Sequence, residues 1–201
     1  MMMDVNSADK WERDYQRGSD GWDLGGPNPV FRNLLADREL SPGKMIVVCS
    51  GRGHDAREFA KHGFQVTAVD FSPSAVREME KMTDSDVAVE ILQHDLFTMP
   101  ARFDGSFDYM LEYTCYCAID PQRRTEFADL AARLLKPGGL YISLAFPISQ
   151  HSGGPPFAVS VSEVLYLFQE RGFKLVERKT PSDSVPARQG AEELLLLQKE
   201  T

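Results

Sequence analysis

The sequence predicts an α/β fold in which one mostly parallel sheet of seven strands carries helices on both faces. Two observations lead to this prediction. Short apolar runs alternate with amphipathic stretches of helical period along most of the chain, which is typical of βαβ units. The last two apolar runs have no helix between them, so we expect an antiparallel strand pair at the C-terminal edge of the sheet.

The strand segments share a short length, an apolar or β-branched composition and flanking turn residues. In chain order they span residues 45–49, 65–70, 87–92, 107–113, 140–146, 173–179 and 191–199. Turn residues at 41–43 precede the first strand, and the breaker Lys-Pro-Gly-Gly at 136–139 precedes the fifth. Because helical patterns separate most of the first five strands, these strands are expected to run parallel.

Helical patterns fill the intervals between the strands. Residues 54–62 carry apolar side chains on one helical face. Ser72-Pro73 opens the next helix, because the missing N–H of a proline has no partner in a first turn anyway. A long helix covers about residues 121–135 and ends at the Lys-Pro-Gly-Gly breaker, and another covers 160–171. Residues 1–40 are expected to form a helical, aromatic segment that covers the active site.

Composition and charge limit the possible functions. The chain has 201 residues, 42% of them hydrophobic, which suits one domain over residues 1–201. A net charge of −8 argues against nucleic-acid binding. With no membrane-length apolar run and no signal-peptide core, we expect a soluble, cytoplasmic protein. Cys49, Cys115 and Cys117 are too few for a disulfide framework and lack metal-site spacing, so no metal is expected. Cys115 and Cys117, which are separated by one residue at the end of a predicted strand, are expected to be free thiols.

Two glycines, Gly51 and Gly53, follow the first strand directly, where open parallel sheets bind their ligands. Glycine permits a sharp turn and lets a ligand approach the backbone. Asp70 ends the second strand, where its carboxylate can accept hydrogen bonds from both hydroxyls of a ribose. The alternative is an ordinary turn in which Asp70 only caps a helix. The strand, helix and acidic residue together favour a ribose-containing cofactor.

The same glycines also fit the G-x-G-x-x-A form of a dinucleotide site, so NAD has to be considered. The chain has no room for the separate substrate domain that most NAD enzymes carry. Asp95 follows the third strand, where its carboxylate can accept a hydrogen bond from an adenine amino group. The helix, the Lys-Pro-Gly-Gly turn and the terminal strand pair follow the layout of S-adenosylmethionine-dependent methyltransferases. The sequence therefore predicts S-adenosylmethionine as the cofactor.

Several segments resemble the thiopurine, thiol and halide methyltransferases, and the thiol and halide members resemble the chain more closely. These segments are WERDYQRGSDGWDLGGPNP, GRGHD, EYTCYCAIDPQRR, LLKPGG, FPISQHSGGPPFAVS and VPARQG. The resemblance covers nearly the whole chain and implies a monomeric, single-domain class I methyltransferase with a Rossmann-like sheet. It implies in-line methyl transfer to a small soft nucleophile: a thiol, thiocyanate, a halide or a thiopurine. A non-catalytic S-adenosylmethionine-binding or regulatory protein of the same fold is the alternative.

The resemblance also assigns roles to individual residues. Around the cofactor it places Trp11, Trp22, Gly51, Gly53, Asp70, Phe71, Asp95, Leu96 and Glu112. Around the substrate it places Trp22, Tyr116, Pro155, Pro156 and Phe157. Tyr113 is the candidate catalytic residue, which either donates a hydrogen bond to the nucleophile or only fills space. Aromatic faces suit this site because they attract a sulfonium as they attract other cations.

One position departs from the family pattern. Relatives usually have glycine where this chain has Cys49, two residues before Gly51. A positive φ at Cys49 would strain the turn by about 1–3 kcal/mol. Because Gly51 and Gly53 remain, we expect Cys49 to lie in extended strand, where it costs little.

Overall fold

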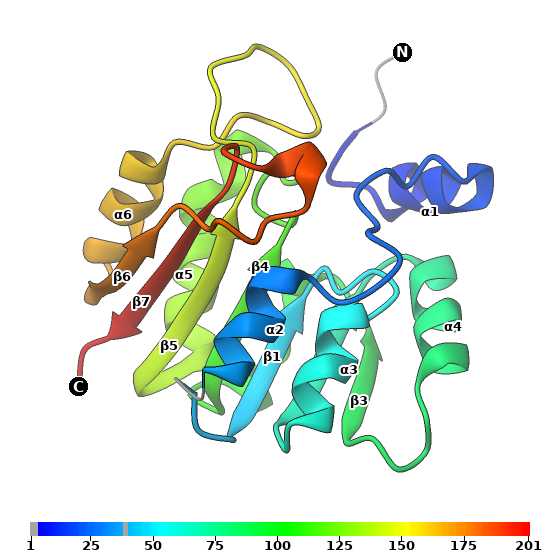
Figure 1. The fold of residues 1–201 in the computed structure, drawn as a ribbon, viewed down its shortest axis with the longest axis horizontal. Coiled ribbons are helices and arrows are strands. Elements are labelled where there is room, and N and C mark those ends of the chain that lie inside the picture. Colours follow the sequence, from blue (N-terminus) through cyan, green and yellow to red (C-terminus); the bar gives the residue numbers. More distant parts are fainter. Residues whose placement is uncertain (1–3, 38–39) are drawn as a thin grey trace.

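The computed structural model describes residues 4–37 and 40–201. One seven-stranded sheet has the order β3-β2-β1-β4-β5-β7-β6 (Figure 1). Its strands are β1 (Lys44–Val48), β2 (Gln65–Asp70), β3 (Val89–Gln93), β4 (Phe107–Tyr113), β5 (Leu135–Ala145), β6 (Phe173–Lys179) and β7 (Glu193–Lys199). The strands β1 to β5 pair in parallel, whereas β7 is antiparallel to both of its neighbours, β5 and β6. The predicted fold class is confirmed.

Helices cover both faces of the sheet. They are α1 (Ala8–Arg17), α2 (Pro29–Ala36), α3 (His54–Lys61), α4 (Pro73–Met82), α5 (Arg124–Leu134) and α6 (Val161–Gln169), with short 3₁₀ turns η1 (Leu96–Thr98), η2 (Ala101–Phe103), η3 (Pro121–Arg123) and η4 (Pro186–Arg188). The helices α2 and α3 pack on one face, and α5 and α6 pack on the other (Figure 1). The predicted opening of α4 is confirmed, because Ser72 caps it and Pro73 begins it.

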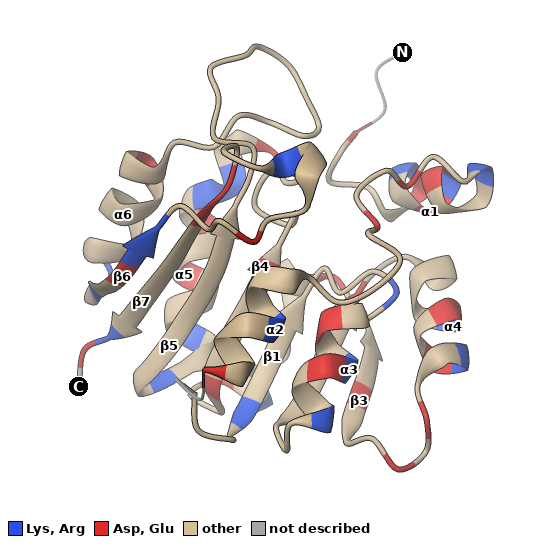
Figure 2. Ribbon diagram, viewed as in Figure 1, with Lys and Arg blue, Asp and Glu red and all other residues tan. Residues whose placement is uncertain are grey.

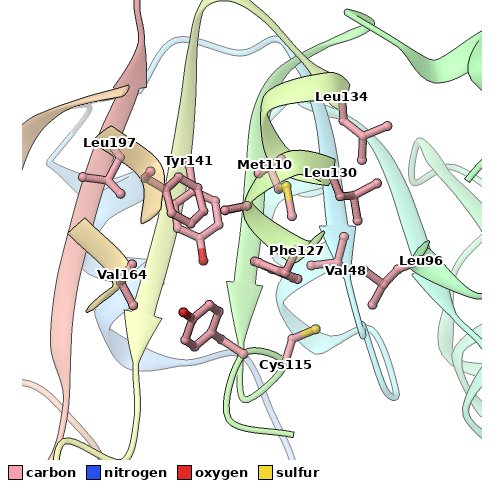
Figure 3. Packing of buried hydrophobic residues seen from close by; sticks show 14 of the residues in the cluster. Val48, Leu96, Met110, Cys115, Phe127, Leu130, Leu134, Tyr141, Val164 and Leu197 are labelled. Carbon is pink, nitrogen blue, oxygen red and sulfur yellow. The ribbon is translucent and has the colours of Figure 1, made fainter. Parts of the chain in front are cut away.

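The central strands are apolar on both sides because both faces of the sheet are covered. In β1, Met45 and Val47 belong to the core layer under α2 and α3, whereas Ile46 and Val48 belong to the layer under α5 and α6. Figure 3 shows the second layer, in which Phe127 of α5 lies among side chains of the sheet. An unbroken apolar run at 45–48 is therefore what a doubly covered strand requires.

The Lys-Pro-Gly-Gly segment lies inside a strand rather than in a turn before it. The preceding helix ends at Leu134, as expected, but β5 begins at once with Leu135 and includes residues 136–139. A register shift between Phe107 and Tyr109 of the neighbouring strand absorbs these residues. Gly138 has a φ of +79°, a conformation that glycine adopts without strain. The strand boundary predicted at residue 140 is therefore wrong.

The order of the strands reverses between β1 and β4, and this switch point lies at the centre of the sheet. In folds of this kind ligands bind at the switch point, outside the carboxyl ends of the strands. The helix α1 lies beyond that edge and contacts α4 (Figure 1). The helices α1, α3 and α4 each carry both acidic and basic residues (Figure 2). Within residues 4–37 and 40–201, no helix has the length and apolarity to cross a membrane.

Candidate functional site

A cavity of about 510 Å³ lies at the carboxyl ends of the central strands. Its walls come from α1 and the segment after it, from the ends of β1 and β2, from η1, and from the loops around residues 114–119, 146–156 and 187–188. The predicted site residues among these walls are Trp11, Trp22, Asp70, Phe71, Asp95, Leu96, Pro155 and Pro156. Residues from five separate parts of the sequence thus meet at one place.

Asp70 ends β2 and its side chain is buried. Its Oδ2 accepts a hydrogen bond from the Gly51 N–H at 2.9 Å, and its Oδ1 accepts one from the Ser72 N–H at 2.9 Å. Burial raises the pKa of this carboxyl above its usual value, in spite of these backbone donors. A carboxylate has about four lone-pair sites, so Asp70 can still accept hydroxyl donors from the cavity. This arrangement suits the two hydroxyls of a ribose.

The glycine loop contributes to the site indirectly, through its contact with Asp70. Both Gly51, with φ +55°, and Gly53, with φ +70°, adopt left-handed backbone conformations. A Cβ on Gly53 would lie 2.6 Å from the side chain of Met79, and one on Gly51 would lie 3.0 Å from the hydroxyl of Tyr15. Neither glycine is among the residues that line the cavity of about 510 Å³. The loop contributes through the Gly51 N–H that holds Asp70.

Cys49 differs from both sequence expectations. Its φ is +48°, so the expectation of extended strand is wrong. The physical reason is that β1 ends at Val48, and the chain begins its turn at the next residue. Cys49 also forms a disulfide with Cys115, with the two Cα atoms 5.5 Å apart, so the expectation of a free thiol is wrong for Cys115. Cys117 is free, and burial raises the pKa of its thiol to about 12.

The other end of the cavity has a carboxylate and flat apolar surfaces. Asp95 caps η1 by accepting a hydrogen bond from the Phe97 N–H at 2.9 Å through Oδ1. Leu96 and Phe71 line the cavity beside it. The guanidinium carbon of Arg123 lies 3.5 Å above the centroid of the Phe97 ring. An aromatic base with an exocyclic amino group would fit this end.

Three aromatic residues of the N-terminal segment form one wall. The rings of Trp11 and Trp22 meet edge to face with centroids 5.5 Å apart, and Tyr15 contacts Trp22 in the same manner at 5.4 Å. The indole N–H of Trp22 donates to the hydroxyl of Tyr15 at 3.3 Å. The covering role expected for residues 1–40 stays a prediction, and these three rings are its candidates within residues 4–37.

Charged groups hold this N-terminal segment in place, and sequence reasoning missed them. Arg52 of the glycine loop forms ion pairs with Asp20, Asp23 and Glu78. Glu12 of α1 accepts hydrogen bonds from the hydroxyls of Ser72 and Ser74 at 2.8 and 2.7 Å. No local pattern marks these pairs, because their members lie 26 to 62 residues apart in the chain.

Besides the two glycines, four predicted site residues do not line this cavity. They are Tyr113, Tyr116, Phe157 and Glu112, of which Tyr113 lines a smaller pocket that shares Trp22, Cys49 and Thr114 with the cavity. Glu112 is buried and bonded to the Ser143 hydroxyl and the Tyr116 N–H, and burial raises its pKa above the usual range. Tyr116 packs edge to face against Phe127. The Tyr113 hydroxyl donates to Glu192 Oε1 at 2.5 Å. The roles assigned to these four residues, like those of the other predicted site residues, stay predictions.

Arg188 lines the cavity, and sequence reasoning did not select it. It belongs to the VPARQG segment, whose resemblance to the family was the only available signal. Its side chain is buried, and its guanidinium carbon lies 5.1 Å from the centroid of the Tyr113 ring and 4.8 Å from that of Phe146. Its Nη1 donates to the Tyr113 hydroxyl, and its Nη2 donates to the Trp22 carbonyl at 3.0 Å. A buried cation thus borders an otherwise largely apolar cavity.

No group of three or more His, Cys, Asp or Glu side chains among residues 4–37 and 40–201 is placed to hold a metal ion. The charged groups that line the cavity are the carboxylates of Asp14, Asp70 and Asp95, the Lys10 ammonium and the guanidiniums of Arg123 and Arg188, beside aromatic faces. Such a set can bind and orient reactants.

Comparison with known proteins agrees with this geometry. The sequence model of the thiopurine S-methyltransferase family matches residues 6–200. The chain is 36% identical over 197 residues to "probable thiol methyltransferase 2" of Arabidopsis thaliana, covering 96% of this chain and 86% of that protein. It is 33% identical to "thiocyanate methyltransferase 1" of Arabidopsis thaliana, covering 92% and 82%. It is 27% identical to a thiopurine S-methyltransferase of Vibrio cholerae, covering 86% of each.

Solved structures share the fold at lower identity. The 1,6-didemethyltoxoflavin-N1-methyltransferase of Burkholderia thailandensis, solved with S-adenosylhomocysteine, has a TM-score of 0.75 at 18% identity and covers 96% of this chain and 87% of its own. A TehB-like S-adenosylmethionine-dependent methyltransferase of Corynebacterium glutamicum has a TM-score of 0.66 at 15% identity and covers 96% and 98%. These similarities establish the class I methyltransferase fold.

Proposed function

This chain belongs to the thiopurine S-methyltransferase family and is an S-adenosylmethionine-dependent methyltransferase, and from this premise we propose that its substrate is a small anionic soft nucleophile. Thiolates and thiocyanate are the leading candidates, because relatives at 36% and 33% identity carry the names thiol and thiocyanate methyltransferase. One observation of the site carries the proposal: the buried guanidinium of Arg188 at the wall of a largely apolar cavity.

The cavity residues fit S-adenosylmethionine. Asp70 presents a buried carboxylate with unused lone pairs to a ribose, and Asp95 presents a half-buried carboxylate to an adenine amino group. The aromatic rings of Trp11 and Trp22 border the same cavity, and such faces attract a sulfonium. The cofactor, when bound, supplies an electrophilic methyl group on a positively charged sulfur.

The surroundings of Arg188 are the reason for proposing that the nucleophile is an anion. Its hydrogen-bond partners are the Tyr113 hydroxyl and the backbone carbonyls of Trp22 and Gly21, all of which are uncharged. A guanidinium taken out of water is unfavourable unless a counter-charge accompanies it. Glu192 is separated from Arg188 by the Tyr113 hydroxyl that both residues bond, and an anion in the cavity would supply a direct counter-charge. An amine or a neutral alcohol would not.

The remaining protein groups orient the reactants and exclude water. Displacement at a methyl carbon requires the nucleophile and the leaving sulfur to lie in line, and fixing that arrangement is worth up to about 7–11 kcal/mol of barrier. The N-terminal wall of Trp11, Tyr15 and Trp22 covers the cavity and limits the access of water. A nucleophile that binds already ionised needs no general base. This suits a site where the Tyr113 hydroxyl is engaged in a hydrogen bond to Glu192.

Methyl transfer to a panel of nucleophiles tests the proposal. Purified protein would be incubated with methyl-labelled S-adenosylmethionine and with thiocyanate, iodide, hydrosulfide, an aromatic thiolate, a thiopurine, an amine and a phenol. We expect turnover of at least one soft anion and none of the amine. Cofactor binding without turnover of any soft anion would refute the proposal.

Replacement of the guanidinium gives the sharper test. Arg188→Met should raise the KM for an anionic nucleophile about tenfold or more, because a hydrogen bond to a charged group is worth about 1.5–3 kcal/mol. The affinity for S-adenosylhomocysteine should change much less. Arg32→Met is the matched control, since Arg32 lies 61% exposed on α2. Equal kinetics in wild type and Arg188→Met would argue for a substrate without charge.

Two further features of the protein belong to the same proposal. We propose that it acts as a monomer, because the walls of the cavity come from one chain and include both the cofactor half and the Arg188 end. The cytoplasmic location expected from the sequence also stays a proposal. Sedimentation of the purified protein, with and without S-adenosylhomocysteine, measures the first of these directly.

A further inference from the structure

Glu192 is a buried carboxylate that lies outside the cavity wall. It directly precedes β7, and its residue is only 1% exposed. Its Oε1 accepts the hydrogen bond from the Tyr113 hydroxyl at 2.5 Å, whereas no partner for its Oε2 is found among the described residues. Burying a carboxylate with one oxygen unsatisfied is unfavourable for stability. Such violations of local rules are expected at functional sites.

The directions of two hydrogen bonds link Glu192 to the cavity. A phenol has one proton to donate, and its oxygen can also accept. The Tyr113 hydroxyl donates to Glu192 Oε1, so the phenol proton lies on the side of Glu192. The lone pairs of the phenol oxygen are then directed away from Glu192, toward the Arg188 guanidinium that donates to them. Hydrogen bonds arranged in such a chain polarise and strengthen one another.

We propose that Glu192 is a positioning residue, which acts through Tyr113 to aim the guanidinium of Arg188 at the substrate end of the cavity. This inference rests on the proposed function, since the group being aimed is the one that binds the anionic nucleophile. Tyr113 is then a positioning residue as well, because its proton is engaged with Glu192 and its oxygen with Arg188.

The chain of three residues also joins three parts of the fold. Tyr113 ends β4, Arg188 ends η4, and Glu192 stands immediately before β7. Arg188 additionally donates to the backbone carbonyl of Trp22 in the N-terminal wall. When the Arg188 guanidinium is held in one orientation, it therefore fixes the position of the C-terminal segment relative to the N-terminal wall.

An orienting role and a purely electrostatic role for Glu192 predict opposite results. As a negative charge near Arg188, Glu192 would weaken the attraction of an anion, so its removal would tighten anion binding. As a positioning residue, its removal would loosen anion binding, because Arg188 would lose its fixed direction. Glu192→Leu removes both the charge and the acceptor. Glu192→Gln removes the charge but keeps an acceptor oxygen of nearly the same shape.

The affinity of the S-adenosylhomocysteine complex for thiocyanate, measured by calorimetry, separates the two roles. We expect Glu192→Leu to weaken thiocyanate binding about tenfold or more and Glu192→Gln to weaken it less, with little change in the affinity for S-adenosylhomocysteine. In turnover assays the KM should rise more than kcat falls. Glu193→Gln is the matched control, because this neighbouring glutamate pairs with Arg178 on β6. Unchanged or tighter thiocyanate binding in both Glu192 variants would overturn the inference.

A second measurement keeps this inference separate from the proposed function. Rotation of the Arg188 guanidinium can be followed by nuclear magnetic resonance in protein labelled with ¹⁵N arginine, without any substrate. We expect hindered rotation in wild type and Glu193→Gln, and faster rotation in Glu192→Leu. If wild type binds no soft anion, the proposed function fails, yet hindered rotation that depends on Glu192 would still support the positioning role. Equal rotation in wild type and Glu192→Leu would overturn it.

Discussion

Glu12 connects the N-terminal wall of the cavity to the sheet, and its replacement gives a prediction with a calculable size. Its carboxylate accepts hydrogen bonds from the Ser74 N–H at 2.8 Å, from the Ser74 hydroxyl at 2.7 Å and from the Ser72 hydroxyl at 2.8 Å. These donors stand at the start of α4, where a negative charge is also favoured by the helix dipole. No residue of α1 is fully buried, so Glu12 provides much of its attachment.

The magnitude follows from the protonation equilibrium. Burial opposes ionisation of Glu12, but the donors of Ser74 and Ser72 outweigh it and lower its pKa from 4.5 to about 2. At 1.36 kcal/mol for each pH unit, the ionised form contributes at most about 3 kcal/mol to the docking of α1. Because the pKa is lowered on docking, this contribution is complete above pH 4.5 and is lost as the pH falls toward 2. Glu12→Gln keeps an acceptor oxygen and should lose about 1–2 kcal/mol.

Hydrogen exchange of the α1 amides measures this docking directly. We expect α1 in Glu12→Gln to exchange about 5 to 30 times faster than in wild type at pH 7, while exchange of the sheet stays unchanged. Asp9→Asn is the control, because it changes the same charge on the same helix at an exposed position. Equal exchange in wild type and Glu12→Gln, or wild-type docking that does not weaken between pH 5 and 3, would refute the reasoning.

Two further replacements test the glycine loop and the cofactor end. Gly53→Ala places a Cβ 2.6 Å from the buried Met79 side chain at φ +70°, so it should lower the free energy of unfolding by more than Gly105→Ala, which has φ +56° and open space around it. Urea unfolding should show a difference of about 1–3 kcal/mol between the two, and equal losses would mean that Met79 yields easily. Asp70→Ala should weaken S-adenosylhomocysteine binding by about 1.5–3 kcal/mol in calorimetry, and an unchanged affinity would refute the ribose assignment.

The order and type of the main elements could be predicted from the sequence because they depend on local periodicity. The strand at 65–70 and the helix opened by Ser72 and Pro73 lie where expected. The strand boundary at 136–139 could not be predicted, because a register shift in β4 decides it. The conformation of Cys49 depended on which residue ended β1. The strand ends at Val48, one residue earlier than predicted, and Cys49 therefore has a positive φ instead of an extended conformation.

The residues of the candidate site could likewise be predicted from the sequence only in part. Asp70, Asp95 and the tryptophans were accessible to sequence reasoning, because they stand at strand ends or in segments that resemble the family. Tyr113 was selected for the same reason, but its neighbours could not be foreseen. Glu192 lies 79 residues from Tyr113 in the chain, and their hydrogen bond exists only because β7 inserts beside β5.

The sequence by itself determined the alternation of strands and helices, the glycine turn after β1 and the acidic residue after β2, because these depend on contacts between near neighbours in the chain. Only the tertiary structure decided which side chains face the cavity. Arg188 lines it, whereas Tyr113 and Glu112 do not, and that difference depends on the packing of strands and loops far apart in the sequence. The chemistry of the pocket therefore depends on residues that only the fold brings together.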